Sequence, residues 1–195
     1  MLYCIRKRIS PRRQLFKAGC AFLYWKLRPS RASRAKSATL SFLKGRSADE
    51  MLDVARAFFR DEYLPRFYQD GLTELWSLRS QGMKLVVVSA SPDVYMRALP
   101  EFMPIDAVLS TRCEVGGDGR YTGQVGENCK GEEKVRRIKQ YLKENGFVLD
   151  MKCSSAYGDS PSDADMMALV NRAVLVNPKK ALLRRRPDGI VVHWT

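Results

Sequence analysis

The chain has 195 residues, a formal net charge of +13 and 45% hydrophobic residues. This length suits one α/β domain, or a core with a small additional cap. The five cysteines are scattered and form no Cys-x-x-Cys pair, which argues against a disulfide scaffold and a zinc site. The longest apolar stretch, residues 18–25, is too short for a bilayer, which takes about 20 residues.

The excess positive charge is confined to the N-terminal quarter. Residues 1–46 contain 13 Lys or Arg and no Asp or Glu, whereas the rest of the chain is balanced. Such a segment favours an anionic membrane surface or a nucleic acid as partner, or it forms a solvated helix face. Nucleic acid is the weakest choice, because no recognised binding motif accompanies the charge. We expect a cytoplasmic protein, with residues 1–46 as a candidate contact to the inner face of a membrane.

Helices are predicted first along the chain. Residues 12–27 and 31–44 predict two amphipathic helices, whose apolar faces either enter a lipid surface or pack on the protein's own core. Ser47 and Glu50 form a capping box that begins the next helix. A further helix is predicted to end at Gly82.

Apolar runs then alternate with helices. Strands are predicted at residues 84–88, 106–110, 153–157, 173–176 and 190–192. Residues 112–125 predict a hairpin, and a helix follows Lys130. This alternation predicts a parallel three-layer α/β fold.

A sharp turn follows the run at residues 153–157. Gly158 and Asp159 come first, and Asp163 lies four residues after Asp159. Such a turn can aim both carboxylates at one point beside the strand's C-terminal end, which suits a hard cation, most naturally Mg²⁺. The alternative is a surface turn whose Asp residues cap a helix.

Two other junctions suit a phosphate. Ser89 follows the run at residues 84–88, where its hydroxyl can bond a phosphate oxygen at the start of a helix. Lys130 lies where a loop enters a helix and can supply a point charge. Taken singly, Ser89 is better explained as a helix cap and Lys130 as a solvated side chain.

Together these stretches resemble a known family. VVVSASP, NCKGEEK and GDSPSDADMM resemble the second, third and fourth motifs of the haloacid-dehalogenase-like (HAD) phosphatases, and most nearly subfamily IB, which includes phosphoserine phosphatases and a bacterial phosphatidylglycerophosphatase. The resemblance implies a Rossmann-type core at residues 71–195 and a helical cap at residues 1–70. It further implies that Ser89, Ala90 and Lys130 bind phosphate, with Ser89 and Lys130 as catalytic groups. Asp159 and Asp163 would hold Mg²⁺.

The chain departs from the family at the first motif. That motif is an apolar strand ending in Asp-x-Asp-x-Thr/Val, whose first Asp is the nucleophile and whose second is the general acid/base. Here no acidic residue precedes Asp49. The first motif would be absent if the sequence came from a gene fragment, if its start codon were wrongly assigned, or if the protein had lost the motif. We expect a vacancy in the sheet between the strands that end near Ser89 and Tyr157.

Two functional hypotheses follow. The first is a Mg²⁺-dependent phosphomonoester hydrolase, truncated so that its nucleophile is absent and inactive as given. The second is a catalytically inactive HAD-like protein that binds phosphate, lipid or nucleic acid. The substrate is either a small phosphomonoester such as phosphoserine or the phosphate of an anionic lipid, and the basic, apolar cap tilts the choice to lipid.

Overall fold

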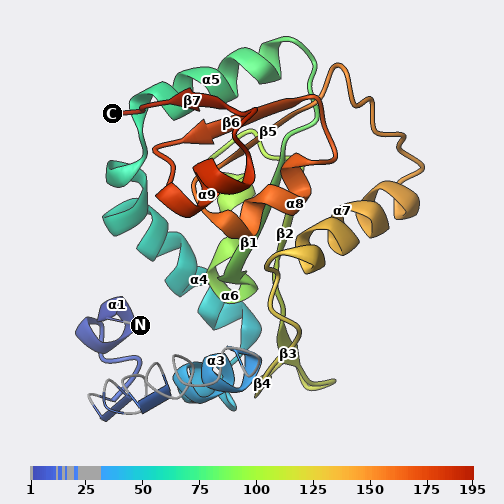
Figure 1. Cartoon of the computed structure of the whole chain (residues 1–195). Coiled ribbons are helices and arrows are strands. Elements are labelled where there is room, and N and C mark those ends of the chain that lie inside the picture. Colours follow the sequence, from blue (N-terminus) through green and yellow to red (C-terminus); the bar gives the residue numbers. More distant parts are fainter. Residues whose placement is uncertain (1, 12, 15, 17–19, 22–31) are drawn as a thin grey trace. The chain divides into compact units, whose positions relative to one another are not determined.

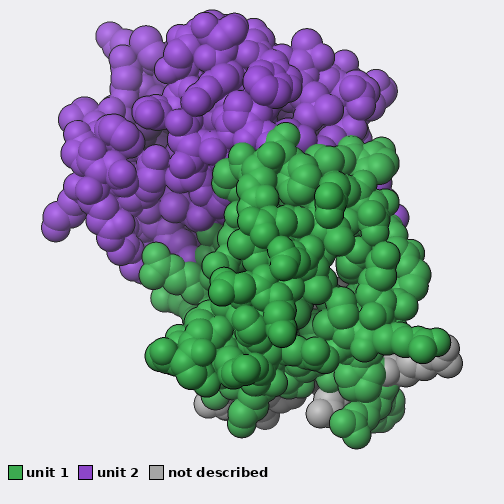
Figure 2. Space-filling model, turned by 180° about the vertical axis from the view of Figure 1, so that it is seen from behind, with its two compact units in different colours: residues 1–65, 91–102, 110–128 green, residues 66–90, 103–109, 129–195 purple. Residues whose placement is uncertain are grey.

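The structure, a computed structural model, describes residues 2–11, 13, 14, 16, 20, 21 and 32–195. The chain divides into two compact units (Figure 2). Unit 1 comprises residues 1–65, 91–102 and 110–128, and unit 2 comprises residues 66–90, 103–109 and 129–195. The sequence placed a single boundary near residue 70. The observed division differs because the hairpin and a short helix, both beyond residue 70, pack with the N-terminal helices.

Unit 1 combines helices with one hairpin (Figure 1). Its elements are α1 (Leu2–Arg6), α3 (Ala32–Leu40), a 3-10 turn (Ser41–Leu43), α4 (Ala48–Phe58), a π-helical turn (Phe59–Tyr63), α6 (Asp93–Met96), a 3-10 turn (Leu99–Glu101), β3 (Cys113–Val115) and β4 (Tyr121–Val125). The predicted cap of α4 is confirmed, because the Ser47 hydroxyl accepts from the backbone N–H groups of Asp49 and Glu50. The predicted hairpin is confirmed as the antiparallel pair β3–β4.

The core of unit 1 joins segments far apart in the sequence. Leu43, Met51, Val94, Cys113 and Tyr121 are all buried in one cluster. Burial of such side chains is worth roughly 1.5–3 kcal/mol each, which holds the hairpin against α4 and α6. An aromatic cluster around the fully buried Phe59 extends this core.

Unit 2 contains the parallel strands (Figure 1). Its elements are a 3-10 turn that begins in unit 1 (Leu64–Arg66), α5 (Gln69–Ser80), β1 (Val86–Pro92), β2 (Ala107–Thr111), α7 (Glu132–Glu144), β5 (Ser155–Gly158), a 3-10 turn (Pro161–Asp163), α8 (Ala164–Met167), β6 (Arg172–Val176), α9 (Lys180–Arg185) and β7 (Ile190–Val192), with the last residues of β1 and β2 assigned to unit 1. Strands β5, β6 and β7 form a parallel sheet in that order, and β1 pairs with β2 separately.

Side chains of β5 alternate between two helical layers. Ala156 packs with α8 and α9, in a cluster centred on the fully buried Met167 and Leu182. The next residue, Tyr157, points the other way and its hydroxyl donates to Glu74 on α5. This alternation follows from the two-residue period of a strand. It confirms the predicted three-layer α/β fold.

Not every predicted helix can be compared with the structure. The predicted helix at residues 12–27, with Phe22, Tyr24 and Trp25, lies largely outside the described residues. The predicted helix at residues 31–44 is observed as α3 followed by the 3-10 turn at Ser41–Leu43. Among the described residues, none of the helices combines the length and apolar character that a membrane crossing requires.

Candidate functional site: a buried lysine–aspartate pair at the strand ends

The predicted phosphate-binding residues lie on β1. Ser89 and Ala90 are half-buried and fall inside the strand, which continues to Pro92. The sequence placed them just after a strand that ended at Val88. The difference arises because the chain stays extended up to Pro92, which is the N-cap residue of α6. The proline ring also disfavours a helical conformation at the preceding residue, Ser91.

Asp163 is the buried acid of the predicted metal site, with only 5% of its surface exposed. Its Oδ2 accepts from the backbone N–H of Ser160 at 3.1 Å and from the Ser160 hydroxyl at 2.9 Å. Its Oδ1 accepts from Nζ of Lys134 at 2.6 Å. Burial alone raises the pKa of Asp163, but the hydrogen bond and charge of Lys134 and the hydrogen bonds from Ser160 bring it below its usual value. The carboxylate is therefore held in its charged form.

Lys134 is the residue that connects this turn to β1. Its Nζ also donates to the carbonyl oxygen of Val88 at 2.8 Å, one residue before Ser89. Only 5% of Lys134 is exposed, so the ammonium group is nearly removed from water. Lysine is almost never fully buried without a partner, and this position is satisfied by one carboxylate and one carbonyl.

The first turn of α7 fixes Lys134 in place. Gly131, the residue before α7, has a φ of +59°, and its N–H donates to the Ser162 carbonyl at 3.3 Å. Glu133 is buried and accepts from Arg136 and Arg137. The bond from Gly131 anchors the start of α7 on the turn that carries Asp163, and the ion pairs of Glu133 lie within the helix itself.

Gly158 allows the turn to fold this tightly. A Cβ atom at this position would lie 2.8 Å from both Cβ and Oδ2 of Asp163. Any other residue would therefore push the Asp163 side chain away from Lys134. Glycine is required here because the Asp163 side chain lies too close for a Cβ atom. The backbone conformation itself does not require glycine, since φ of Gly158 is outside the left-handed region.

Asp159, the other predicted metal ligand, is exposed. Its Oδ2 lies 2.8 Å from Nζ of Lys179, and its carbonyl accepts from the backbone N–H of Lys179 at 2.9 Å. The two side chains are 56% and 63% exposed. This pair is therefore screened by water, and a cation could displace Lys179 at small cost.

Lys130, the predicted catalytic lysine, is exposed beside the same turn. It precedes Gly131, whose N–H donates to the Ser162 carbonyl, so this loop lies next to the turn that carries Asp163. The buried lysine is four residues further on, and sequence reasoning missed it. The available signal was its place on the apolar face of α7, where Lys134, Ile138 and Leu142 follow at intervals of four.

The oxygen atoms that this turn offers are of the type that binds Mg²⁺. Asp159 and Asp163 offer hard oxygen ligands, and Mg²⁺ is commonly held by one or two carboxylates together with water and phosphate oxygens. Across the part of the chain that the structure describes, no group of three or more His, Cys, Asp or Glu side chains could hold a metal. Any further ligands would therefore come from water, substrate or a group outside this set.

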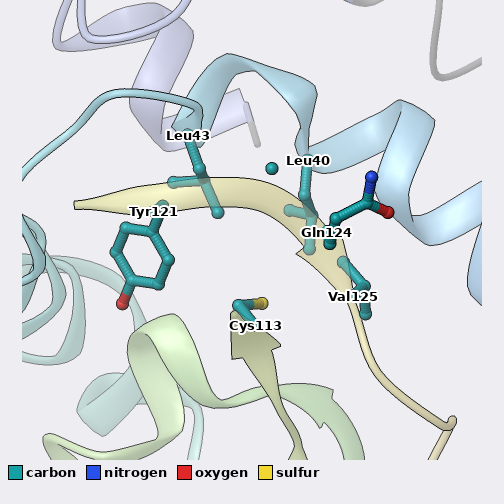
Figure 3. A pocket seen from close by; sticks show the side chains of 7 residues that line it. Leu40, Leu43, Cys113, Tyr121, Gln124 and Val125 are labelled. Atoms are coloured by element: carbon teal, nitrogen blue, oxygen red, sulfur yellow. The ribbon is translucent and has the colours of Figure 1, made fainter. Parts of the chain in front are cut away.

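A small pocket in unit 1 offers no catalytic group. It lies between the 3-10 turn after α3 and the hairpin, and Figure 3 shows Leu43, Cys113 and Tyr121 among the side chains around it. Burial, followed by the negative charge of Asp93, raises the pKa of Cys113 to about 12, so the thiol stays protonated and unreactive.

The comparisons with known proteins identify the family of the chain. Residues 1–168 match the family model described as haloacid dehalogenase-like hydrolase. The chain belongs to this family. Among curated relatives, Protein CicA of Caulobacter vibrioides is 31% identical over 73% of this chain and 62% of its own length. Phosphoserine phosphatase SerB1 of Mycobacterium tuberculosis is 30% identical over 77% of this chain and 48% of its own length. This HAD-family chain thus spans 62% of the length of the first relative and 48% of the length of the second.

A solved structure shares the fold of this chain. A protein of unknown function from Bordetella pertussis Tohama I superimposes with a TM-score of 0.80, over 89% of this chain and 79% of that chain, at 23% identity. At this identity the likeness concerns the fold alone. The predicted membership of the family is confirmed.

Proposed function

We propose that unit 2 binds the phosphoryl group of a phosphomonoester and takes part in its hydrolysis, in the manner of the HAD phosphatases. The observation that carries this proposal is the buried ammonium group of Lys134, which contacts both Asp163 and the β1 carbonyl next to Ser89. A desolvated cation at that point attracts a phosphoryl oxygen strongly, because little water screens it. The similarity to a curated phosphoserine phosphatase supports the same reaction class.

Each side chain then has a defined task. The Ser89 hydroxyl and the Ala90 N–H would donate to phosphoryl oxygens. Lys134 would neutralise their charge, a role that the sequence suggested for Lys130. Lys130, exposed beside Gly131, would contact substrate at the rim. In phosphoryl transfer such positioning and charge neutralisation supply most of the catalysis.

Asp159 and Asp163 would hold Mg²⁺, directly or through water. The ion would supply positive charge against the transferring phosphoryl group. Lys179 would leave Asp159 when the ion binds, since their exposed ion pair contributes little.

The chain as given contains no carboxylate in the position of the family's nucleophile, because its first acidic residue is Asp49. In HAD phosphatases an Asp attacks phosphorus and the ester P–O bond breaks. A second Asp protonates the departing alkoxide, and water then hydrolyses the aspartyl-phosphate. We therefore expect the 195-residue chain to bind phosphate and Mg²⁺ but not to turn over. The second candidate function is a catalytically inactive HAD-like protein that binds phosphate.

Within the family we propose subfamily IB, on the three motif sequences that resemble it, and a cap function for the helices of unit 1. The substrate would be a small phosphomonoester such as phosphoserine or an anionic lipid phosphate. A cytoplasmic protein that contacts an anionic membrane through residues 1–46 would suit the second substrate.

The test is a fusion that places an apolar strand ending in Asp-x-Asp-x-Thr before Met1. With Mg²⁺ and p-nitrophenyl phosphate or phosphoserine, the fusion should hydrolyse substrate, and the original chain should not. An Asn-x-Asp version of the fusion is the matched control and should be inactive.

Two variants of the active fusion distinguish the roles of Lys130 and Lys134. Lys134→Met should abolish turnover, and Lys130→Met should change mainly the KM. A folded fusion without activity would refute the hydrolase proposal in favour of a binding protein. Turnover by the original chain that Asp159→Asn abolishes would refute the need for the added nucleophile.

A further inference from the structure

The loop between α7 and β5 carries a patch of exposed apolar side chains (Figure 1). Val148 is 94% exposed, Met151 is 49% exposed and Phe147 is 38% exposed. Single apolar side chains on a surface need no explanation, but three within five consecutive positions form a patch. The patch belongs to unit 2 and contains none of the residues proposed to bind phosphate or Mg²⁺.

The start of this loop is fixed by the end of α7. Gly146 has a φ of +66°, and the N–H of Phe147 donates to the Leu142 carbonyl at 2.9 Å, as in a Schellman cap. The Phe147 ring lies edge to face with Tyr141, with 6.0 Å between the ring centroids. The cap therefore explains an apolar residue at position 147, but it does not explain Val148.

The other end of the loop is fixed by a carboxylate and a carbonyl. Oδ1 of Asp150 accepts from the backbone N–H groups of Lys152 and Cys153 at 2.9 and 3.1 Å. The Met151 carbonyl accepts from the N–H of Asn171, the residue before β6, at 2.9 Å. Because the loop is anchored at both ends, it presents its apolar side chains already ordered, which lowers the entropic cost of burying them in a partner.

Four exposed lysines flank the patch. Lys139 and Lys143 lie one turn apart on α7, and Lys152 lies at the other end of the loop. Nζ of Lys84 lies 5.5 Å from the centre of the Phe147 ring. A lysine can lay its alkyl chain along an apolar surface and keep its ammonium group in water or at a phosphate.

The acidic groups near the patch are fewer than the lysines. Glu144 and Asp150 are the carboxylates of the segment. Asp106 lies 3.6 Å from Lys84 but is bonded more closely by Arg79 at 2.9 Å, so Arg79 balances its charge. The surroundings of the patch therefore carry a positive excess, which attracts an anionic surface and repels a second copy of the same patch.

We propose that the loop inserts Phe147, Val148 and Met151 into the interfacial layer of an anionic phospholipid membrane, while the flanking lysines contact the head groups. The strength of such a shallow contact grows with the apolar area that is buried and with the attraction to anionic lipid. This site is separate from residues 1–46, whose membrane contact was inferred from charge alone.

The size and shape of the patch favour a membrane over a protein partner. A stable protein interface covers about 800 Å² on each partner, whereas even an aromatic side chain buries at most about 250 Å². Three side chains are therefore too few to form such an interface. A side chain that is 94% exposed, such as Val148, also projects from the surface, which suits insertion into a fluid layer.

Flotation of the full chain with vesicles of equal parts phosphatidylglycerol and phosphatidylcholine tests the proposal. Val148→Asp should lower the partition coefficient at least about fivefold, because it removes an inserted side chain and adds a charge that anionic lipid repels. Val115→Asp is the matched control, since it makes the same change at a 39% exposed position of β3 and should leave binding unchanged. Circular dichroism verifies that both variants are folded.

Any binding through residues 1–46 is the same in both Asp variants, so the difference between them reports the loop alone. Val148→Trp gives a second readout, because lipids brominated on their acyl chains quench an inserted indole. Its emission should be quenched more than that of the unsubstituted chain, whereas Val115→Trp should add no quenching. The Val148→Trp protein should also keep part of its binding at roughly 0.5 M salt, where charge alone is screened.

Three results would overturn the proposal. The first is equal vesicle binding by Val148→Asp and Val115→Asp, and the second is a Val148→Trp variant that gains no quenching. The third is concentration-dependent self-association in sedimentation velocity that Val148→Asp abolishes, which would show that a second copy covers the patch. None of these results depends on hydrolysis, so the proposed function is tested separately.

Discussion

Nζ of Lys134 lies 2.6 Å from Oδ1 of Asp163, and the side chains of both residues are 7% exposed. A second ion pair of similar length, between Lys179 and Asp159 at 2.8 Å, lies on the surface of the same unit. The two pairs have the same residue types and differ in burial. They therefore allow the effect of desolvation to be measured within one protein.

Lys134→Met should lower the free energy of unfolding by about 3 kcal/mol, because it leaves the buried carboxylate of Asp163 without its cation. Lys179→Met, the matched control, should change it by less than about 1 kcal/mol, since water replaces the lost partner. Urea unfolding followed by circular dichroism measures both values. Equal effects of the two substitutions would contradict the role of burial.

The stability of the protein should fall in acid partly through Asp163. Its pKa in the folded state is lowered, so its carboxylate contributes stability above the unfolded-state value of about 3.9. That contribution is lost as the pH falls through the folded-state pKa of Asp163.

Unfolding midpoints between pH 6 and pH 2 test this. Asp163→Asn should be less stable than the wild type at pH 6, and its midpoint should fall less on acidification. Parallel curves for the two proteins would show that Asp163 does not contribute.

Gly158→Ala should destabilise unit 2 by about 1–3 kcal/mol, as overpacking does in a well-packed site. The added methyl group would lie 2.8 Å from the Asp163 side chain and would have to displace it. Gly117→Ala is the control, because nothing lies within 4 Å of the position of its added methyl group. Thermal unfolding compares the two, and a Gly158→Ala protein as stable as the control would contradict the close approach.

The basic N-terminal quarter should bind anionic vesicles. Interfacial attraction is about 1 kcal/mol for each basic residue near the surface, and salt weakens it. Within the described part, two of these basic side chains already form ion pairs inside unit 1, since Arg6 pairs with Glu62 and Lys7 with Asp61.

Flotation with phosphatidylglycerol vesicles measures this binding, and phosphatidylcholine vesicles are the control. Binding through charge alone should be lost by roughly 0.5 M salt, whereas insertion of Trp25 should retain some binding and shift Trp emission to the blue. Absence of binding at low salt would remove the membrane proposal and the preference for a lipid substrate.

The sequence by itself determined the elements whose signals are local. The cap at Ser47, the hairpin at residues 112–125 and the apolar strands were predictable, because each depends on neighbours within a few residues. The turn that carries Asp159 and Asp163 was predictable for the same reason. Its Gly, Pro and Ser residues specify a tight passage from strand to helix.

Only the tertiary structure decided which lysine is desolvated. Lys130 and Lys134 are four residues apart, and both suit a phosphate site in sequence. Lys134 is buried because α7 begins on the turn that carries Asp163 and its side chain extends toward β1, so its partners are 29 and 46 residues away. The pairing of Asp159 with Lys179 and the inclusion of the hairpin in unit 1 likewise depend on distant contacts. Burial and long-range pairing arise from packing of the whole unit, and local patterns do not specify them.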